Sequence, residues 1–412
     1  MRAPTVALAA LVLVTGTAVG FCGEDRKADG RAASAVLIDA CTGRILYERN
    51  ARERRPVAST TKIMTALLII ERGSLQDVVT VSENAADTEN SSLLEAGEHI
   101  SLENLLKAVL IQSANDAAIA AAEHVSGSVS AFCAAMNERA RDLGAKDTHF
   151  TNPHGLHEPD HYSTARDLAL IARAAMRHAL FRALVSTEST TIAWEGHKGG
   201  RRLCNHNRLL AQLPAVDGIK TGFVKESGRC LAFSATRNGC RMIGVLLDSP
   251  NLWKEAADLI AYGERRYQPI RLVRARSAVV KQAVAYGEPA KIPLMPVRDV
   301  GLWVPPGERD RYVVRTSAER LRAPVQAGDR AGVVKVFDGR RLIASVPLEA
   351  GAASRYSAAR AWRAWLLRGV GVLILAFLVV RTYGAVAKSH GRSGRGIAAW
   401  LRGLDPRRSS DS

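Results

Sequence analysis

The chain has 412 residues and a formal net charge of +17 at pH 7, with 47% hydrophobic and 24% charged residues. This length and apolar content predict two or three folded domains and exclude a largely disordered polypeptide. The positive charge is compatible with nucleic acid, acidic polymers or an anionic membrane surface, and the two ends of the chain discriminate among these partners.

The N-terminus has the features of a secretory signal peptide. Arg2 precedes an apolar run that ends in the small residues Ala18 and Gly20, so we expect residues 1–20 to be removed. The alternatives are an uncleaved anchor or a buried helix. Lipidation at the next cysteine is disfavoured because Phe21 is bulky where that processing site has a small residue. Export would place the protein body outside the membrane, where we expect no nucleic-acid partner.

Residues 30–267 combine strand and helix patterns. A hairpin is predicted at Thr42-Gly43, and Asn238-Gly239 between alternating apolar residues is a strong signal for a second one. Amphipathic helical spacing fills the region between them, including a helix after Ser59 and another capped by Ser101. We therefore expect a mixed α/β domain whose sheet is assembled from both of its ends, with helices packed on it.

Residues 270–350 differ in pattern from the preceding domain. Short valine-rich runs are broken by proline and glycine, and helical periodicity is absent. This composition predicts a small all-β domain. Its sequence contains no cluster of residues suited to catalysis.

A membrane anchor is predicted at residues 366–387. Only Arg368 and Arg381 are charged there, and at about 1.5 Å per residue the segment can cross a hydrocarbon core of about 30 Å. The basic tail, residues 388–412, favours the cytoplasmic side, which would leave the protein body facing outward. The alternative is a helix that lies in the interface, because arginines such as Arg360 add positive charge on the other flank.

Ser59 and Lys62 are the first candidate pair for chemistry. They stand three residues apart at the start of a helix, so a hydroxyl and an amine share one face. A serine becomes a nucleophile when a base lies within hydrogen-bond reach, and a lysine is that base only when its pKa is well below its free value. Alone, the pair is better explained by an N-cap and a surface charge.

Two further stretches contain candidate site residues. QSANDAA places Ser113 and Asn115 at a break between helices, which exposes side chains and backbone in a cleft. GIKTGFV places Lys220, Thr221 and Gly222 in a strand, where the glycine lets another group approach the backbone closely. Taken singly, the first stretch is explained by helix capping and the second by an edge strand protected by lysine.

Together, the order S-x-x-K, S-x-N and K-T-G resembles the penicillin-binding proteins and serine β-lactamases. FTNPHGLHEPDHYSTARDLALIARAAM and VDGIKTGFVKESGRCLAFSATRNG are similar, more narrowly, to the low-molecular-mass D-alanyl-D-alanine carboxypeptidases. The likeness covers roughly residues 32–265 and extends to the following β domain and the anchor. It implies an α/β transpeptidase-type fold with a small all-β C-terminal domain and a C-terminal membrane helix.

The resemblance implies a role for each residue of the first two motifs. Ser59 is the acylated nucleophile, and Lys62 is the base that takes its proton. Ser113 passes protons toward the leaving amine, and Asn115 holds the substrate and the lysine. The charge of Lys220 would help to lower the pKa of this base.

The strand motif is expected to hold the substrate. Lys220 and Thr221 bind its terminal carboxylate, and Gly222 belongs to the same binding set. The backbone N–H groups of Ser59 and Phe223 form the oxyanion hole, which stabilises charge as it develops.

The implied reaction is acyl transfer to the serine, release of the terminal D-alanine of a peptidoglycan stem peptide, and hydrolysis by water. β-Lactams such as penicillin mimic the dipeptide and would trap the acyl-enzyme. The resemblance implies neither a cofactor nor a metal.

Val224 departs from the pattern, because many relatives have threonine at that position. The departure removes one possible hydrogen bond to substrate and raises the alternative of a membrane-anchored wall protein that binds peptidoglycan with little or no turnover.

A β-lactamase is a third reading, but no convincing glutamate motif for deacylation lies between Asn115 and Lys220. An endopeptidase that cuts cross-links would use the same residues.

HEPDH, from His157 to His161, matches the zinc-protease string H-E-x-x-H, which requires two histidines on one helix face. Pro159 disfavours a helix there, so we predict a loop that leads to a helix over residues 162–173 and no zinc site. The six cysteines show no zinc-ligand spacing either, and the sequence does not give their pairing.

Overall fold

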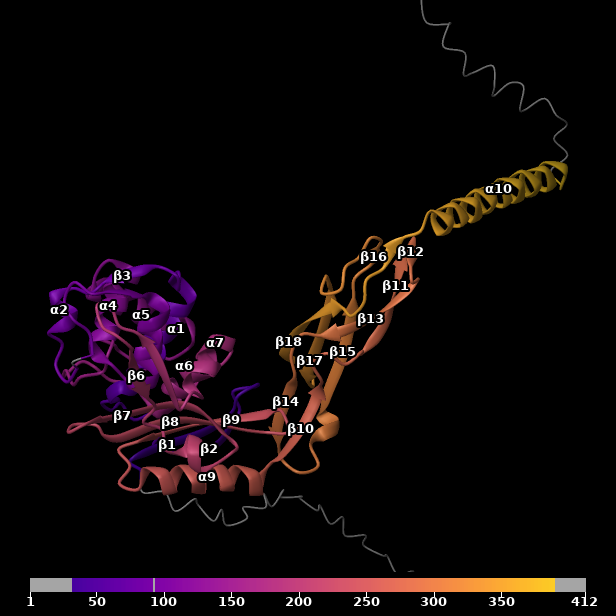
Figure 1. Ribbon diagram of the computed structural model, residues 1–412. Coiled ribbons are helices and arrows are strands. Elements are labelled where there is room, and N and C mark those ends of the chain that lie inside the picture. Colours follow the sequence, from indigo (N-terminus) through magenta and orange to yellow (C-terminus); the bar gives the residue numbers. More distant parts are fainter. Residues whose placement is uncertain (1–31, 92, 390–412) are drawn as a thin grey trace, which may run out of the picture. The chain divides into compact units, whose positions relative to one another are not determined.

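The protein is described from a computed structural model that covers residues 32–91 and 93–389 (Figure 1). The expected signal peptide and most of the basic tail lie outside the described residues. The described chain divides into two compact units. The first contains residues 45–235 with 32–38 and 242–266, and the second contains residues 267–389 with two short loops, 39–44 and 236–241.

A five-stranded sheet, in the order β2-β1-β9-β8-β7, organises the first unit (Figure 1). The predicted assembly from both ends of the domain is confirmed, because an N-terminal hairpin lies beside the strands that close the domain. Both predicted hairpin turns are present. Strand bounds in this region are β1 Ser34–Asp39, β2 Ile45–Arg49, β3 Val78–Thr80, β4 His99–Ser101, β5 Ser189–Ala193, β6 Gly200–Cys204, β7 Val216–Val224, β8 Gly228–Arg237 and β9 Cys240–Leu247.

Helices cover both faces of this sheet, with α9 along one face and most of the others on the opposite side (Figure 1). The helix bounds are η1 Ala58–Thr61, α1 Lys62–Arg72, α2 Glu83–Ala86, α3 Leu102–Lys107, η2 Ala108–Gln112, α4 Asn115–Ser126, α5 Val129–Asp142, α6 Ala165–Ala175, α7 Ala179–Val185, α8 Leu209–Gln212 and α9 Leu252–Arg266. Ser101 caps α3 as predicted, since its side chain accepts a hydrogen bond from the Asn104 N–H.

The predicted helix start at residue 162 is wrong by three residues. Tyr162 instead forms an isolated β-bridge with His149, and Thr164 accepts a hydrogen bond from the Asp167 N–H. Helix α6 therefore begins at Ala165, because a side-chain cap at its N-terminus fixes where the helical bonds begin.

The second unit is built of strands, as its valine-rich pattern predicts. Its bounds are β10 Gln268–Val273, β11 Val280–Ala285, β12 Gly287–Glu288, β13 Lys291–Pro296, β14 Val300–Val304, η3 Arg309–Arg311, β15 Tyr312–Ala318, β16 Leu321–Arg322, β17 Arg330–Asp338, β18 Arg341–Ala350 and β19 Arg355–Tyr356. A six-stranded sheet has the order β15-β17-β18-β13-β11-β16. Buried Val, Ile and Leu side chains from these strands form a core of their own.

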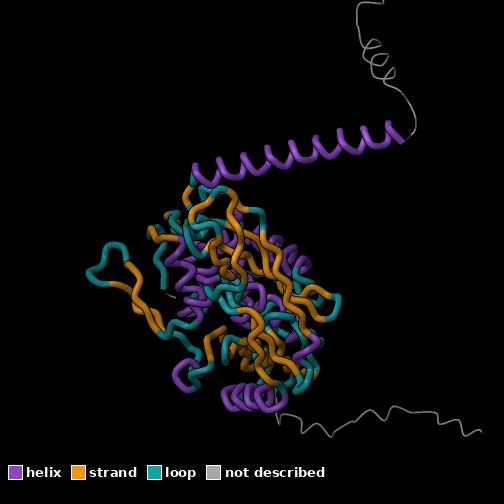
Figure 2. Tube along the Cα trace, turned by 90° about the vertical axis from the view of Figure 1, so that its right-hand side faces the viewer, coloured by secondary structure: helices purple, strands orange, loops and turns teal. Residues whose placement is uncertain are grey.

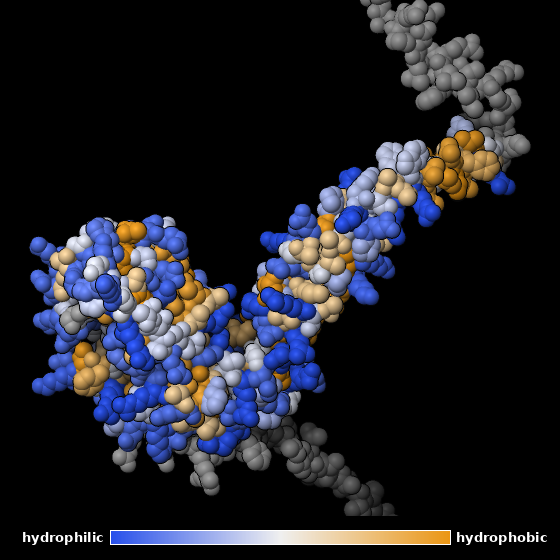
Figure 3. Space-filling view, in the orientation of Figure 1, coloured by the Kyte–Doolittle hydropathy of each residue, from blue (hydrophilic) through white to orange (hydrophobic). Residues whose placement is uncertain are grey.

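Helix α10, Ala358–Ser389, follows the β domain without interruption (Figure 2). It begins earlier than residue 366, where the apolar segment starts. Residues Ala358–Ala385 are long and apolar enough to cross a membrane, with a hydropathy of 2.0. Apolar side chains gather on its visible surface (Figure 3), and large ones such as Leu373 and Phe377 are exposed.

A buried ion pair ties the β5–β6 hairpin to the segment that precedes β4. The guanidinium of Arg201 donates to both carboxylate oxygens of Glu98, and both side chains are only 5% exposed. The same guanidinium lies 4.4 Å from the ring centre of Trp194. Because a buried charge without its partner is strongly destabilising, this pair contributes strongly to holding the hairpin in place.

We expect Arg201→Ala to lower the free energy of unfolding by about 3–5 kcal/mol, because the carboxylate of Glu98 would remain buried and unpaired. The neighbouring Arg202 is exposed and is the matched control, with an expected change within about 0.5 kcal/mol for Arg202→Ala. Urea unfolding followed by tryptophan fluorescence measures both. Equal losses in the two variants would contradict this assignment.

Candidate active site

Ser59 lies in a tight turn that leads into α1. Residues Ala58–Thr61 form the 3-10 helix η1, and the regular α-helix begins only at Lys62. In a 3-10 helix the side chains at i and i+3 lie directly in line. This local geometry aligns the Ser59 hydroxyl with the Lys62 amine more closely than an α-helical first turn would.

The Lys62 amine is buried and has three partners. Its Nζ lies 2.9 Å from Ser59 Oγ, 2.6 Å from Asn115 Oδ1 and 2.9 Å from the backbone carbonyl of His154. The side chain is fully inaccessible to solvent. The structure thus brings the first two sequence motifs into direct contact and adds a carbonyl that the sequence did not identify.

Burial lowers the pKa of Lys62 well below its usual value, and the positive charge of Lys220 lowers it further, while Asp116 opposes both effects. Burial also lowers the pKa of Lys220, to about 7. Burial and the charge of Lys220 thus act in the same direction on Lys62, toward its neutral form. A neutral Lys62 beside a charged Lys220 is the state in which one lysine is a base and the other binds an anion.

Ser113 and Asn115 lie where the chain breaks between two helices. Ser113 ends η2 in the left-handed conformation, with φ of 66°, and Asn115 begins α4. The amide of Asn115 is held from its other side, because Nδ2 donates to the Glu89 carbonyl over 2.9 Å. This contact turns Oδ1 toward Lys62, which explains the orientation that the amine requires.

Two glycines permit close backbone contacts around the serine. A Cβ added to Gly155 would lie 2.0 Å from the Ala58 carbonyl oxygen, and φ of +91° at Gly155 is itself unfavourable for other residues. A Cβ added to Gly222 in β7 would lie 3.0 Å from the Ser59 nitrogen. The strand therefore passes directly beside the nucleophile candidate.

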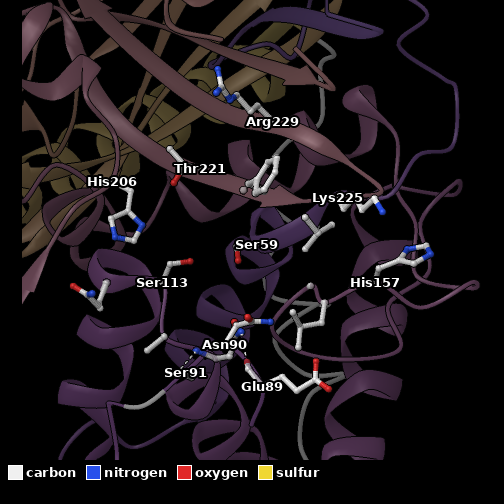
Figure 4. Close-up of a pocket in the computed structure, with 18 of the residues that line it drawn as sticks. Ser59, Glu89, Asn90, Ser91, Ser113, His157, His206, Thr221, Lys225 and Arg229 are labelled. Carbon is white, nitrogen blue, oxygen red and sulfur yellow. Dashed lines mark hydrogen bonds between the residues drawn. The ribbon is translucent and has the colours of Figure 1, made fainter. Parts of the chain in front are cut away.

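An open cleft of about 1460 Å³ surrounds Ser59. Figure 4 shows Ser59 at its centre, with Ser113 and Thr221 on the same side as His206 and with Lys225 and His157 on the other. Gly222 and Phe223 of β7 and Asn115 of α4 also line it. Lys220 is 3% exposed and its Nζ donates to the Thr221 carbonyl, so it lies behind the strand surface. All the predicted site residues thus belong to the cleft or to the two buried lysines at its wall.

The HEPDH string is not helical and does not assemble two zinc ligands. His161 Nε2 lies 2.8 Å from Thr61 Oγ1, and its Nδ1 accepts from the Thr151 N–H. Burial lowers the pKa of His161 to about 4. Across residues 32–91 and 93–389, no group of three or more His, Cys, Asp or Glu side chains is arranged to hold a metal ion.

The comparisons with known proteins agree with this geometry. A family model described as D-alanyl-D-alanine carboxypeptidase matches residues 23–251, and one described as penicillin-binding protein 5, C-terminal domain, matches residues 267–354. The chain is 33% identical to the D-alanyl-D-alanine carboxypeptidase DacF of Bacillus subtilis over 83% of this chain and 92% of that protein. It is 32% identical to the D-alanyl-D-alanine carboxypeptidase DacA of Escherichia coli K12 over 76% of this chain and 81% of that protein.

Comparison of the chain with solved structures points to the same family. Penicillin binding protein 5 from Haemophilus influenzae is 30% identical with a TM-score of 0.57, covering 79% of this chain and 98% of that chain. The D-alanyl-D-alanine carboxypeptidase DacD from Francisella tularensis is 28% identical with a TM-score of 0.55, covering 79% of this chain and 94% of that chain.

Gly155→Ala tests whether the close contact at Ala58 positions Ser59. We expect about a 10²-fold loss of reaction at Ser59, which is the effect of a misplacement of about 1 Å. Gly127→Ala is the control, because its φ is also positive, at +77°, but no heavy atom lies within 4 Å of an added Cβ. The measurement is the rate of labelling by a fluorescent penicillin. Equal rates in the two variants would show that the contact does not position the serine.

Proposed function

Because this chain belongs to the family of D-alanyl-D-alanine carboxypeptidases, which are serine peptidases, we propose that it removes the terminal D-alanine of peptidoglycan stem peptides through an acyl-enzyme on Ser59. The observation that supports this assignment best is the buried Lys62 amine, 2.9 Å from the serine hydroxyl. A hydroxyl beside a neutral amine can lose its proton as it attacks a carbonyl carbon.

Acylation follows from the positions of these groups. The oxygen of Ser59 attacks the carbonyl carbon between the two D-alanines, and its proton passes to Lys62. The oxyanion that forms accepts hydrogen bonds from the N–H groups of Ser59 and Phe223, and the passage of β7 beside the Ser59 nitrogen supports this pairing. Ser113 then passes a proton to the leaving D-alanine, and water later hydrolyses the ester.

Substrate binding is assigned to the strand motif. Thr221 contacts the terminal carboxylate from the cleft wall, the charge of Lys220 binds it from behind the strand, and Gly222 leaves room for the peptide beside Ser59. Asn115 contacts Lys62 directly and lines the cleft, so it can serve both the base and the substrate. β-Lactams, which carry a carboxylate next to a reactive carbonyl, would occupy the same positions.

We also propose that the catalytic unit acts outside the cytoplasmic membrane and that α10 anchors it there. The supporting observations are the signal-peptide pattern of residues 1–20 and the apolar character of Ala358–Ala385. Export fits a substrate that belongs to the cell wall.

The first test is D-alanine release from diacetyl-L-Lys-D-Ala-D-Ala by the full chain in detergent. We expect release by the wild type and a loss of at least about 10³-fold in Ser59→Ala, because the nucleophile is removed. No release from a folded wild type that still reacts with penicillin would contradict the carboxypeptidase assignment. It would favour a peptidoglycan-binding protein with little turnover, for which Val224 is the first residue to change to threonine.

The pH dependence of penicillin acylation tests the coupling of the two lysines. Acylation requires neutral Lys62, so its second-order rate constant, which reports the free protein, rises with pH through the pKa of Lys62. Lys220→Gln removes a positive charge that lowers this pKa, so the rising limb should move to higher pH. Thr221→Val is the control, since it removes a carboxylate contact without changing a charge and should lower the rate without moving the limb. If the acylation rate of Lys220→Gln rises over the same pH range as that of the wild type, the coupling is refuted.

A further inference from the structure

The proposed function determines in which direction the substrate peptide runs along β7. The terminal carboxylate lies at Lys220 and Thr221, and the reacting carbonyl lies at Ser59, beside Gly222. The acyl side of the substrate must therefore continue past Gly222, toward the end of the strand at Val224. β7 is an edge strand of the sheet, and an edge strand binds an extended peptide readily.

The distance along the strand identifies which residues lie next to the acyl side of the substrate. Extended chains rise about 3.3 Å per residue, so β7 ends at Val224 about 7 Å beyond Gly222, and Lys225 follows in the turn. The residue that precedes the acylated D-alanine would lie beside Phe223 and Val224. The end of a long side chain on that residue then reaches Lys225 and Glu226.

Lys225 and Glu226 are fixed in the turn that follows β7. The Val224 N–H donates to the Ser227 hydroxyl over 3.2 Å, which closes the turn around the two residues. Both side chains are exposed and both line the cleft. Within the described part of the chain, neither side chain has an ion-pair or hydrogen-bond partner, so both charges are available to a ligand.

The opposite wall of the cleft at this end comes from another segment. His157 and Leu156 line it, from the loop that also supplies the carbonyl bonded to Lys62. Figure 4 shows His157 and Lys225 on the same side of Ser59, away from Thr221. This end of the cleft is therefore lined from two segments, and the turn after β7 supplies it with one exposed cation, Lys225, and one exposed anion, Glu226.

We propose that Lys225 and Glu226 recognise the side-chain end of the stem peptide's third residue, and that they favour an end group with both an ammonium and a carboxylate. A diamino dicarboxylic acid such as meso-diaminopimelate has this end group, whereas lysine ends in an ammonium alone. The carboxylate pairs with Lys225 and the ammonium pairs with Glu226. This proposal rests on the proposed function, because the direction of the peptide follows from it.

Three tripeptides of the form X-D-Ala-D-Ala test the carboxylate and the ammonium of the end group separately. The residue X is Nα-acetylated meso-diaminopimelate, the same residue with its side-chain carboxylate amidated, or diacetyl-L-lysine, which is neutral. For the full chain in detergent, we expect kcat/KM to be about two- to five-fold higher for the first peptide than for its amide, as exposed ion pairs give.

The variants assign the two contacts. Lys225→Gln should abolish the preference for the free carboxylate over its amide, and Glu226→Gln should lower kcat/KM equally for both ammonium-bearing peptides. The kcat/KM of each variant for diacetyl-L-Lys-D-Ala-D-Ala, whose end group is neutral, is the reference against which its preference among the peptides is expressed. Lys198→Gln is the control, since Lys198 is exposed in the β5–β6 hairpin and does not line the cleft.

The outcomes distinguish this proposal from the function on which it rests. If Lys225→Gln keeps the wild-type preference while the neutral peptide is still hydrolysed, the recognition proposal is overturned and the carboxypeptidase function stands. If the wild type shows no preference, the proposal is overturned in the same way. If a folded wild type hydrolyses none of the three peptides, both proposals fail.

Discussion

The site depends on one buried amine whose hydrogen-bonding capacity is fully used. Asn115 Oδ1 and the His154 carbonyl can only accept hydrogen bonds, so each takes an N–H from Lys62. A neutral amine has two N–H groups and one lone pair. Once both N–H groups are engaged, the lone pair faces Ser59 Oγ, the third partner. In its neutral form, which burial favours, the amine is therefore aimed at the serine.

Holding that amine requires backbone segments from distant parts of the sequence to meet at short range. The His154 carbonyl reaches Lys62 only because Gly155, the next residue, packs against Ala58 without a side chain. The Asn115 amide faces the amine because the Glu89 carbonyl holds its other end. Each contact involves a backbone carbonyl, so the position of the amine depends on how these segments fold.

The sequence predicted the parts of this arrangement that are local. Spacing and turn chemistry indicated the two hairpins, the cap at Ser101 and the break at Ser113, because each depends on residues that are close in the chain. The resemblance supplied the candidate residues, and the structure brings them together around one cleft. The His154 and Glu89 carbonyls had no sequence signal, since every residue has a carbonyl and only tertiary packing selects one. The start of α6 was misplaced because an amphipathic pattern does not locate the capping residue.

The relative size of the two effects that lower the pKa of Lys62 also indicates how this pKa responds when a substrate binds. In the free protein, burial comes first and the charge of Lys220 second in lowering the pKa of Lys62. A bound carboxylate would compensate the charge of Lys220 and so remove most of its influence on Lys62. The substrate also displaces water from the cleft, which strengthens the effect of burial. Burial must therefore keep the base neutral at the moment of attack, which is consistent with a lysine that is completely enclosed before any substrate binds.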